Sequence, residues 1–369
     1  MKKIILVTVI IILLIVAVVI NKNKITNKRI SVALQANPTA VKPGQQLKKT
    51  ISTKKQKSIF VPSWQVGKDK ALQLEDYDRL LYFGLTPNNT GINKDEAYDK
   101  LQYLDTIQIN KILVIKMIND NINELVLNNT DVQKRVINET INIAKEYKFT
   151  EIALDIELFS LFQNEKKAQI NSFVNKFYTN VKDNNLRLSI ILYGDVVYRK
   201  KAFDLKFVAN NTDEIFVMAY DFHKSKGGEP GPNFPFSGKE KYGYDFQQMI
   251  TDYLQITSPE KFSVIFGMYG YEWTVDEKKR PIHQAEALTY NQIKKQFLDQ
   301  CEWQDCIVKR DDLAKETEVD YITSEVVDNI GRINYHIIWF EDNESVSIKT
   351  KYLEEQGINS TAFWAYGYF

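Results

Sequence analysis

Cysteine and histidine are scarce in this sequence, with 2 and 3 copies among 369 residues. A zinc centre built from several cysteine and histidine ligands is therefore almost excluded, and so is a scaffold held by many disulfides. Proline and glycine are also few, which excludes collagen-like repeats and low-complexity disorder. The glycine-rich stretch 227–231 lacks the lysine and the helix start of a phosphate cradle. We therefore expect neither a metal nor a cofactor.

Acidic residues are absent from the first 68 positions, which carry 13 of the 48 lysines and arginines. The rest of the chain holds 35 basic and 47 acidic residues and is therefore acidic. A domain that binds nucleic acid needs a basic face of its own. The composition thus disfavours a nucleic-acid partner for the body of the protein.

A long apolar run occupies the beginning of the chain. Residues 4–20 follow two lysines, are apolar except for Thr8, and as a helix would span roughly 25 Å. No small-residue cleavage site follows the run, so we interpret residues 1–21 as an uncleaved signal-anchor, a transmembrane helix, rather than a cleaved signal peptide.

Residues 22–57 contain two prolines and ten lysines or arginines but no acid, a composition typical of a flexible basic stalk. The expected localisation is the cell membrane, with a single span and the body of the protein outside the cell. The protein would be secreted if the leader were cleaved.

The body, 58–369, alternates strand-like and helical patterns. Near-continuous apolar runs predict strands at 58–65, 79–85, 111–117, 149–157, 186–193, 214–222, 261–269 and 361–369. Helical patterns lie near 95–108, 130–147, 164–183, 244–257 and 343–356. Thr130 and Gln133 fit a capping box at the start of the clearest helix. This order predicts an α/β fold, a (β/α)8 TIM barrel, with a doubly wound open sheet as the competitor.

The seventh connection, about 271–340, is too long for a simple crossover. It contains a predicted helix at 287–300 and an apolar run at 335–340, so we expect a small α+β insertion between strands 7 and 8. Cys301 and Cys306 lie in this insertion. They either form a small-loop disulfide, if the protein is exported, or remain two free thiols.

Two carboxyl residues end the fourth predicted strand. Side chains alternate along a strand, so Ala153, Asp155 and Glu157 share one face, directed into the barrel. Two adjacent carboxyls in a semi-buried site cannot both ionise cheaply, and one tends to keep a proton. Such a pair can supply a general acid, although the same spacing also occurs on solvated strands.

A second polar group closes the sixth predicted strand, where Met218 and Tyr220 share a face and Asp221 follows. Aromatic side chains on other strands could line a substrate-binding cleft or could equally pack the barrel. These are Trp64, Tyr269 and Trp273.

Together these segments resemble glycoside hydrolase family 18, the chitinase-like barrels. Asp155 and Glu157 match the last two acids of the family's fourth-strand motif, D-x-x-D-x-D-x-E, and Met218, Tyr220 and Asp221 match its M-x-Y-D motif. The stretches 266–274 and 361–364 are similar to the seventh and eighth strands, the latter ending in Trp364. The stretches 335–342 and 231–233 are similar to the branch of spore-cortex and cell-wall glucosaminidases.

The resemblance, which covers 58–369, implies a role for each matched residue. Glu157 would protonate the glycosidic oxygen and later activate water, while the 2-acetamido oxygen of the substrate acts as the nucleophile. Asp155 would orient the acetamido group, and Tyr220 would hydrogen-bond its oxygen. Asp221 would support the same subsite, which Met218 also lines, and Trp364 would stack beneath the sugar.

The implied function is hydrolysis of β-1,4 bonds beside N-acetylglucosamine by a retaining, substrate-assisted mechanism. Peptidoglycan is the favoured polysaccharide, and chitin or another glycan is possible. Alternatives are a weakly active or inactive carbohydrate-binding barrel at the cell surface, and a scaffold for an envelope partner. We expect a monomer.

Two positions depart from the family motif, because Thr150 and Ala153 replace its first two acids. Asp155 thereby lacks the inner carboxyl with which it would share a proton. We therefore expect Asp155 to stay ionised, which would favour the proton on Glu157 and lower the rate. We further expect Glu151, at the strand start, to face solvent.

Overall fold

The computed structural model describes residues 54–67, 71–158, 163–327 and 330–369. The predicted anchor at 1–21 and the stalk up to residue 53 lie outside the described residues. Within the described part of the chain, no helix combines the length and the apolar character needed to cross a membrane.

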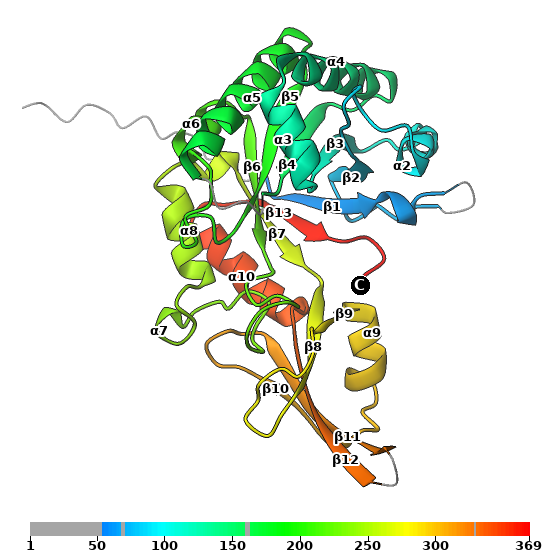
Figure 1. Ribbon diagram of the computed structural model, residues 1–369, viewed down its shortest axis with the longest axis vertical. Helices are drawn as coiled ribbons and strands as arrows, with labels where there is room; N and C mark the ends of the chain where they lie inside the picture. Colours follow the sequence, from blue (N-terminus) through cyan, green and yellow to red (C-terminus); the bar gives the residue numbers. More distant parts are fainter. Residues whose placement is uncertain (1–53, 68–70, 159–162, 328–329) are drawn as a thin grey trace, which may run out of the picture. The chain divides into compact units, whose positions relative to one another are not determined.

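Eight parallel strands close into a barrel in the order β1-β13-β7-β6-β5-β4-β3-β2 (Figure 1). Their bounds are β1 Gln56–Pro62, β2 Arg79–Leu85, β3 Asn110–Met117, β4 Glu151–Ile156, β5 Arg187–Tyr193, β6 Glu214–Ala219, β7 Phe262–Gly267 and β13 Ser360–Trp364. The predicted barrel is therefore confirmed, and the open-sheet alternative is wrong. Several strands are shorter than predicted, because the chain turns at their carboxyl ends.

Helices cover the outside of the barrel, as Figure 1 shows. They are α2 Glu96–Asp99, α3 Asp120–Asn128, α4 Thr130–Glu146, α5 Gln163–Asp183, α6 Leu205–Asn210, α7 Lys239–Tyr242, α8 Phe246–Leu254 and α10 Asn343–Glu355, with short turns η1 Ser63–Gln65, η2 Lys100–Leu104 and η3 Pro259–Lys261. Helix α4 begins where its pattern predicted, but the capping box at Thr130 is wrong. Asn129 caps the helix instead, because its side chain accepts from the amides of Asp131 and Val132.

The insertion is a five-stranded sheet in the order β10-β11-β12-β8-β9. Its elements are β8 Tyr269–Val275, β9 Glu286–Thr289, α9 Tyr290–Ile293, η4 Lys294–Leu298, β10 Gln304–Arg310, β11 Thr317–Val327 and β12 Ile330–Phe340. The helix expected at 287–300 is preceded by a strand, because 286–289 pairs with β8. Cys301 and Cys306 are joined in a disulfide, so the free-thiol alternative is wrong.

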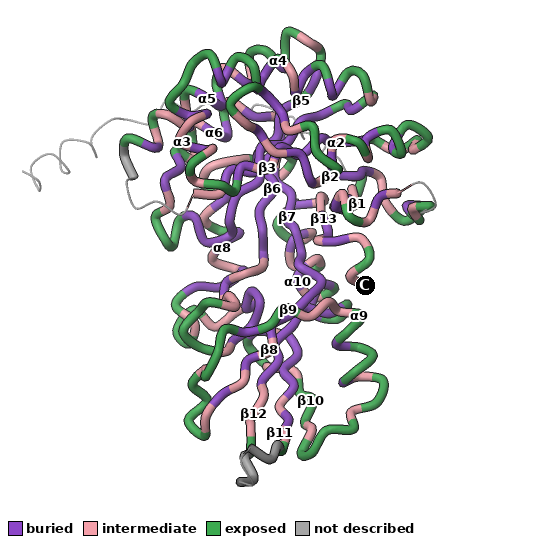
Figure 2. The backbone as a smooth tube through the Cα atoms, turned by 45° about the vertical axis from the view of Figure 1, so that its right-hand side comes forward, coloured by how far each residue is buried: buried purple, intermediate pink, exposed green. Residues whose placement is uncertain are grey.

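The barrel interior is buried along the strands, as the tube in Figure 2 shows. At the amino ends of the strands it holds a charged layer. Arg79 donates to both oxygens of Glu214, at 2.5 and 2.8 Å, and Ser189 donates to Glu151. Glu151 is only 3% exposed, so the expectation that it faces solvent is wrong. Burial and the charge of Glu214 raise the pKa of Glu151 to about 7.

Candidate active site

A hollow of about 180 Å³ opens at the carboxyl ends of the barrel strands. This end of an eight-stranded α/β barrel is where the loops gather and where such barrels carry their active sites. The hollow is lined by Phe60, Phe83, Asp155, Glu157, Ile191, Tyr193, Met218, Tyr220, Asp221, Tyr269 and Trp364. The structure thus brings together seven of the nine residues singled out from the sequence.

Asp155 and Glu157 rise from β4 into this hollow, on the face predicted by the alternation. The amide of Glu157 donates to the carbonyl of Met117 at 2.8 Å, and its carbonyl accepts from Asn123 at 3.0 Å. The carboxylate of Glu157 accepts from the hydroxyl of Tyr193. Both the main chain and the side chain of Glu157 are therefore held in place.

Asp155 is almost completely buried, with 3% of its surface exposed. Its Oδ1 atom has no hydrogen-bond partner among the described residues. Burial, and then the charge of Glu157, hold the pKa of Asp155 well above its usual range, while Lys116 opposes the shift. The expectation that Asp155 stays ionised is therefore wrong, because loss of water around the carboxyl outweighs loss of the neighbouring acid.

Lys116 and Tyr193 were missed by the sequence reasoning. Lys116 on β3 is the register partner of Asp155 on β4, and its Nζ lies 5.3 Å from the ring centroid of Phe83. Tyr193 is the last residue of β5. Lys116 interrupts the apolar run 112–117 of this strand, and this break in the pattern was the available signal. For Tyr193 no signal was available until the register of β4 against β5 was known.

Tyr220 and Asp221 follow β6. Burial, and then the charge of Asp155, raise the pKa of Tyr220 well above its usual value, so its hydroxyl keeps the proton and remains a donor. Asp221 has a left-handed backbone, with φ at 59°. Its carboxylate accepts from the hydroxyls of Tyr269 and Tyr271, both on β8. The insertion therefore holds one of the acids of the hollow.

Asn233, which is 1% exposed, holds the turn at Asp221 in place. Its Oδ1 accepts from the amide of Asp221 at 2.8 Å, and its Nδ2 donates to the carbonyls of Gly267 and Tyr269 at 3.4 and 3.2 Å. One amide side chain thus ties together the ends of β6 and β7 and the start of β8. The sequence analysis placed Asn233 in the segment 231–233, which resembles the family, but predicted no contact for its side chain.

A buried ion cluster supports Asn233 in turn. Glu316 accepts from the amides of Asn233 and Phe234, at 2.5 and 2.8 Å. Lys349 on α10 donates to Glu316 and Glu341, at 2.8 and 2.5 Å, and all three side chains are fully buried. The cluster joins the insertion, the loop after β6 and the last helix of the barrel.

Aromatic rings form the remaining wall. Trp364 at the end of β13 packs against Phe83 and Phe60, with centroids 4.7 and 5.6 Å apart. Tyr269 lies against Tyr220 at 5.9 Å, and Met218, which is 6% exposed, lines the same hollow. These contacts leave Trp364 lining the hollow.

Two tryptophans predicted to bind sugar do not line the hollow. Trp273 is fully buried in the core of the insertion, against Tyr271, so no ring face is available to a ligand. Trp64 lies on η1 and is 48% exposed, outside the set of lining residues. The prediction for Trp273 is wrong because strand alternation directs it into the insertion core.

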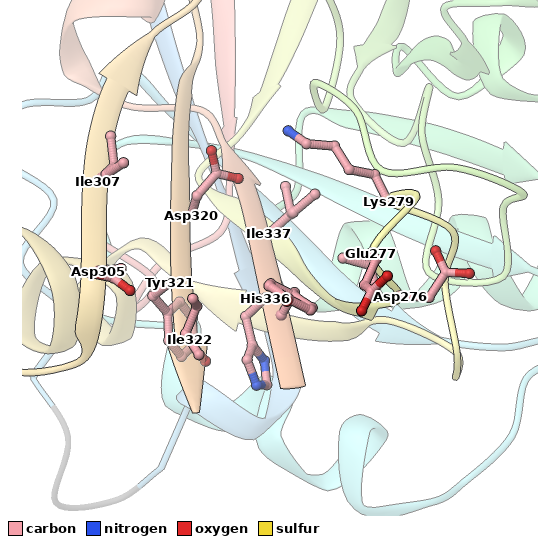
Figure 3. A pocket seen from close by; sticks show the side chains of 12 residues that line it. Asp276, Glu277, Lys279, Asp305, Ile307, Asp320, Tyr321, Ile322, His336 and Ile337 are labelled. Atoms are coloured by element: carbon pink, nitrogen blue, oxygen red, sulfur yellow. The ribbon is translucent and has the colours of Figure 1, made fainter. Parts of the chain in front are cut away.

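A separate hollow of about 340 Å³ lies on the insertion sheet, and Figure 3 shows its side chains. Ile307, Asp320 and Ile337 come from neighbouring strands, and Glu277 and Lys279 from the turn after β8. It shares no lining residue with the hollow at the strand ends. No cluster of three or more possible metal ligands occurs among the residues that the structure describes.

An eight-stranded parallel barrel that gathers three carboxyls, three tyrosines and a tryptophan at its strand ends has the architecture of the barrel enzymes. The sequence profile of the glycosyl hydrolases family 18 matches residues 26–368. The chain therefore belongs to glycosyl hydrolase family 18, and the resemblance identified from its motifs is confirmed.

Characterised relatives are distant and longer. The cortical fragment-lytic enzyme of Bacillus anthracis is 23% identical over 254 residues, which cover 66% of this chain and 52% of that protein. A putative sporulation-specific glycosylase of Bacillus subtilis is 21% identical over 242 residues, with 65% and 52% covered. The chain thus spans about half the length of the curated relatives it matches.

Solved structures share the fold. A group IV chitinase of Ostrinia furnacalis superposes with a TM-score of 0.70 at 15% identity, covering 85% of this chain and 93% of that one. The spore cortex-lytic enzyme SleL of Bacillus cereus superposes with a TM-score of 0.65 at 18% identity, covering 85% and 71%. The barrel with its insertion is therefore an established architecture.

Proposed function

We propose that this protein hydrolyses β-1,4 bonds beside N-acetylglucosamine in a wall polysaccharide, with peptidoglycan favoured over chitin. The observation that carries the proposal is the convergence of Asp155, Glu157, Tyr220 and Trp364 on one hollow. Membership of family 18 supports a glycosidase. The named cortical fragment-lytic and chitinase relatives support a polymer that contains N-acetylglucosamine.

In the proposed reaction Glu157 gives its proton to the glycosidic oxygen as the bond to the anomeric carbon breaks. The substrate's own acetamido oxygen attacks that carbon, so no protein nucleophile is needed. Water, deprotonated by Glu157, then opens the cyclic intermediate with overall retention. The hydrogen bond from Tyr193 sets the direction of the Glu157 carboxyl.

Asp155 begins the cycle protonated and buried. As positive charge develops on the sugar ring and the acetamido group, the proton of Asp155 passes to the Glu157 carboxylate, which has just given up its own, and Lys116 limits the cost of the ionised Asp155. The proton returns to Asp155 when Glu157 takes a proton from the attacking water. The protonated Tyr220 donates to the acetamido oxygen and directs its attack. Asp221, held by Tyr269 and Tyr271, adds a fixed negative charge beside the same subsite.

The decisive test compares wild type with Glu157→Gln on purified wall sacculi and on chitin oligomers. We expect release of reducing ends to fall by about 10²–10⁴ in the variant, the usual contribution of general acid–base catalysis. Glu240→Gln makes the same chemical change on an exposed helix and should leave the rate unaltered. Binding without turnover by the wild type would instead identify a carbohydrate-binding barrel.

We further propose that residues 1–21 hold the protein at the cell membrane with the barrel outside the cell. The apolar run after two lysines supports a membrane helix. The Cys301–Cys306 disulfide supports an oxidising compartment, since disulfides rarely persist in the cytosol.

A further inference from the structure

A third hollow, of about 470 Å³, lies beside the candidate active site, between the stretch after β5 and the loop after β6. Its lining comprises Tyr198, Arg199, Lys201, Phe222, His223, Lys224, Lys226, Gly227, Gly228, Glu229 and Tyr242. We call it the basic hollow, because four of these residues carry positive charge. The catalytic mechanism proposed above uses none of them.

Tyr193 lines the hollow at the strand ends, called the catalytic hollow below, and its ring contacts two lysines that line the basic hollow. The Nζ of Lys201 lies 3.1 Å from the centroid of the Tyr193 ring, and the Nζ of Lys224 lies 5.1 Å from it. The hydroxyl of the same ring donates to Glu157. A group bound in the basic hollow is therefore one side chain away from the proposed proton donor.

The positive charge of this hollow is only partly neutralised. Arg199 and Lys201 pair with Asp195, a side chain that is 5% exposed. Within the described part of the chain, no carboxylate lies within 4.0 Å of the ammonium groups of Lys224 and Lys226. Glu229 is the one acid in the lining. The hollow is thus cationic in a body whose composition is acidic overall.

Asp195 is one carboxylate beside several cations, so the positive charges still repel one another. Burial, together with the charges of Lys224 and Arg199, lowers the pKa of Lys201 to about 8, although Asp195 acts in the opposite direction. Burial lowers the pKa of His223, which disfavours its charged form, although the hydrogen bond between its Nδ1 and the carbonyl of Pro232 acts in the opposite direction. A bound oxyanion would offset the mutual repulsion of the three cations.

An aromatic surface accompanies the charge. Tyr198 is 46% exposed, and its ring stacks on Tyr244 with centroids 5.0 Å apart and planes inclined by 12°. The guanidinium of Arg199 lies 5.4 Å from the ring of Phe222, the residue that follows Asp221. Aromatic faces suit sugar rings, and lysines and arginines suit oxyanions. The combination fits an acid-bearing sugar better than a neutral one.

We propose that the basic hollow is an oxyanion subsite, which receives a carboxylate or phosphate carried by the glycan unit next to the cleaved bond. The inference rests on the proposed function and narrows its substrate to a negatively charged glycan. A carboxylate would come from a peptide or lactyl substituent, and a phosphate from an ester on the sugar. Both would contact Lys224 and Lys226 at the open side.

The test measures binding to full-length protein carrying Glu157→Gln, so that turnover does not interfere. The probes are chitotetraose, a disaccharide-peptide repeat of peptidoglycan with free carboxylates, the same repeat with its carboxylates amidated, and a chitin oligomer with a 6-phosphate. Added substitutions are Lys224→Gln with Lys226→Gln. The matched control is Lys278→Gln with Lys295→Gln, two exposed lysines of the insertion.

We expect loss of Lys224 and Lys226 to weaken binding of the acid-bearing probes about tenfold at low salt, in line with two partly exposed charge contacts. Chitotetraose and the amidated repeat should change less than about twofold, and 0.5 M salt should remove most of the difference. The control pair should have no effect. If only the carboxylate probe or only the phosphate probe binds more weakly, that probe identifies the source of the oxyanion.

Equal weakening of neutral and acidic probes, or no weakening of either, overturns the inference. Failure of the proposed function is distinguishable, because it would be seen as absence of turnover by the wild type on every substrate. Selective loss of acidic-probe binding would then still establish the subsite.

Discussion

Replacement of Glu151 by glutamine should change how the stability of the barrel depends on pH. Glu151 lies in the charged layer at the amino ends of the strands, where it accepts from Ser189 and lies 3.4 Å from the exposed guanidinium of Arg187. Its pKa rises from 4.5 to about 7 on folding, mainly through burial and then through the charge of Glu214. Folding therefore favours the protonated acid.

The sign follows from linkage. A carboxyl whose pKa is raised in the folded state contributes its full stability below about pH 4.5, and that contribution is lost as pH rises through about 7. The shift corresponds to about 3 kcal/mol, of which about 2–3 kcal/mol is lost between pH 5 and pH 8. Glutamine cannot ionise, and its carbonyl can still accept from Ser189.

The assay is urea unfolding of wild type and Glu151→Gln at pH 5, 6, 7 and 8. The two proteins should have similar free energies of unfolding at pH 5, and the variant should be the more stable by about 2–3 kcal/mol at pH 8. Glu240→Gln, on an exposed helix, should follow the wild type at every pH. Parallel curves for wild type and Glu151→Gln would refute the reasoning.

Two further predictions concern the connection between insertion and barrel. Asn233→Ala removes the acceptor for the Asp221 amide and the donor to two carbonyls. We therefore expect kcat on chitin oligomers to fall about 10–100-fold, with a smaller change in KM. If kcat is unaltered and only the melting temperature falls, Asn233 has a structural role alone. Cys301→Ser with Cys306→Ser opens a short loop and should lower the free energy of unfolding by about 2 kcal/mol, as measured by urea denaturation, while kcat is retained because neither cysteine lines the catalytic hollow. Unchanged stability in the double variant, or a wild type indifferent to a reducing agent, would contradict this second expectation.

The barrel and most of its site could be predicted because both depend on local patterns in the sequence. Apolar runs marked the strands, and the period of two placed Asp155 and Glu157 on the inner face. The same period places Glu151 on that face too. We predicted that Glu151 faces solvent because it is charged. That prediction is wrong because Arg79 and Glu214 come from strands whose proximity the local pattern does not reveal.

Contacts between distant segments account for what was missed. Tyr193 reaches Glu157 from the neighbouring strand, and Asn233 reaches three different strand ends. Neither contact follows from the order of residues, since each requires the closed barrel. The state of Asp155 was predicted wrongly for a related reason, because burial is a property of the assembled strand ends and not of the motif.

Strand β8 begins two residues after β7 ends, so the insertion directly continues a strand of the barrel. From it come Tyr269 and Tyr271, which hold Asp221, and Glu316, which supports the loop of Asn233. A trimmed barrel, made by excising 269–340 in search of a minimal enzyme, would lose the two tyrosine hydroxyls that hold the carboxylate of Asp221. A design that moves this site to another scaffold therefore has to include both the barrel strand ends and the insertion.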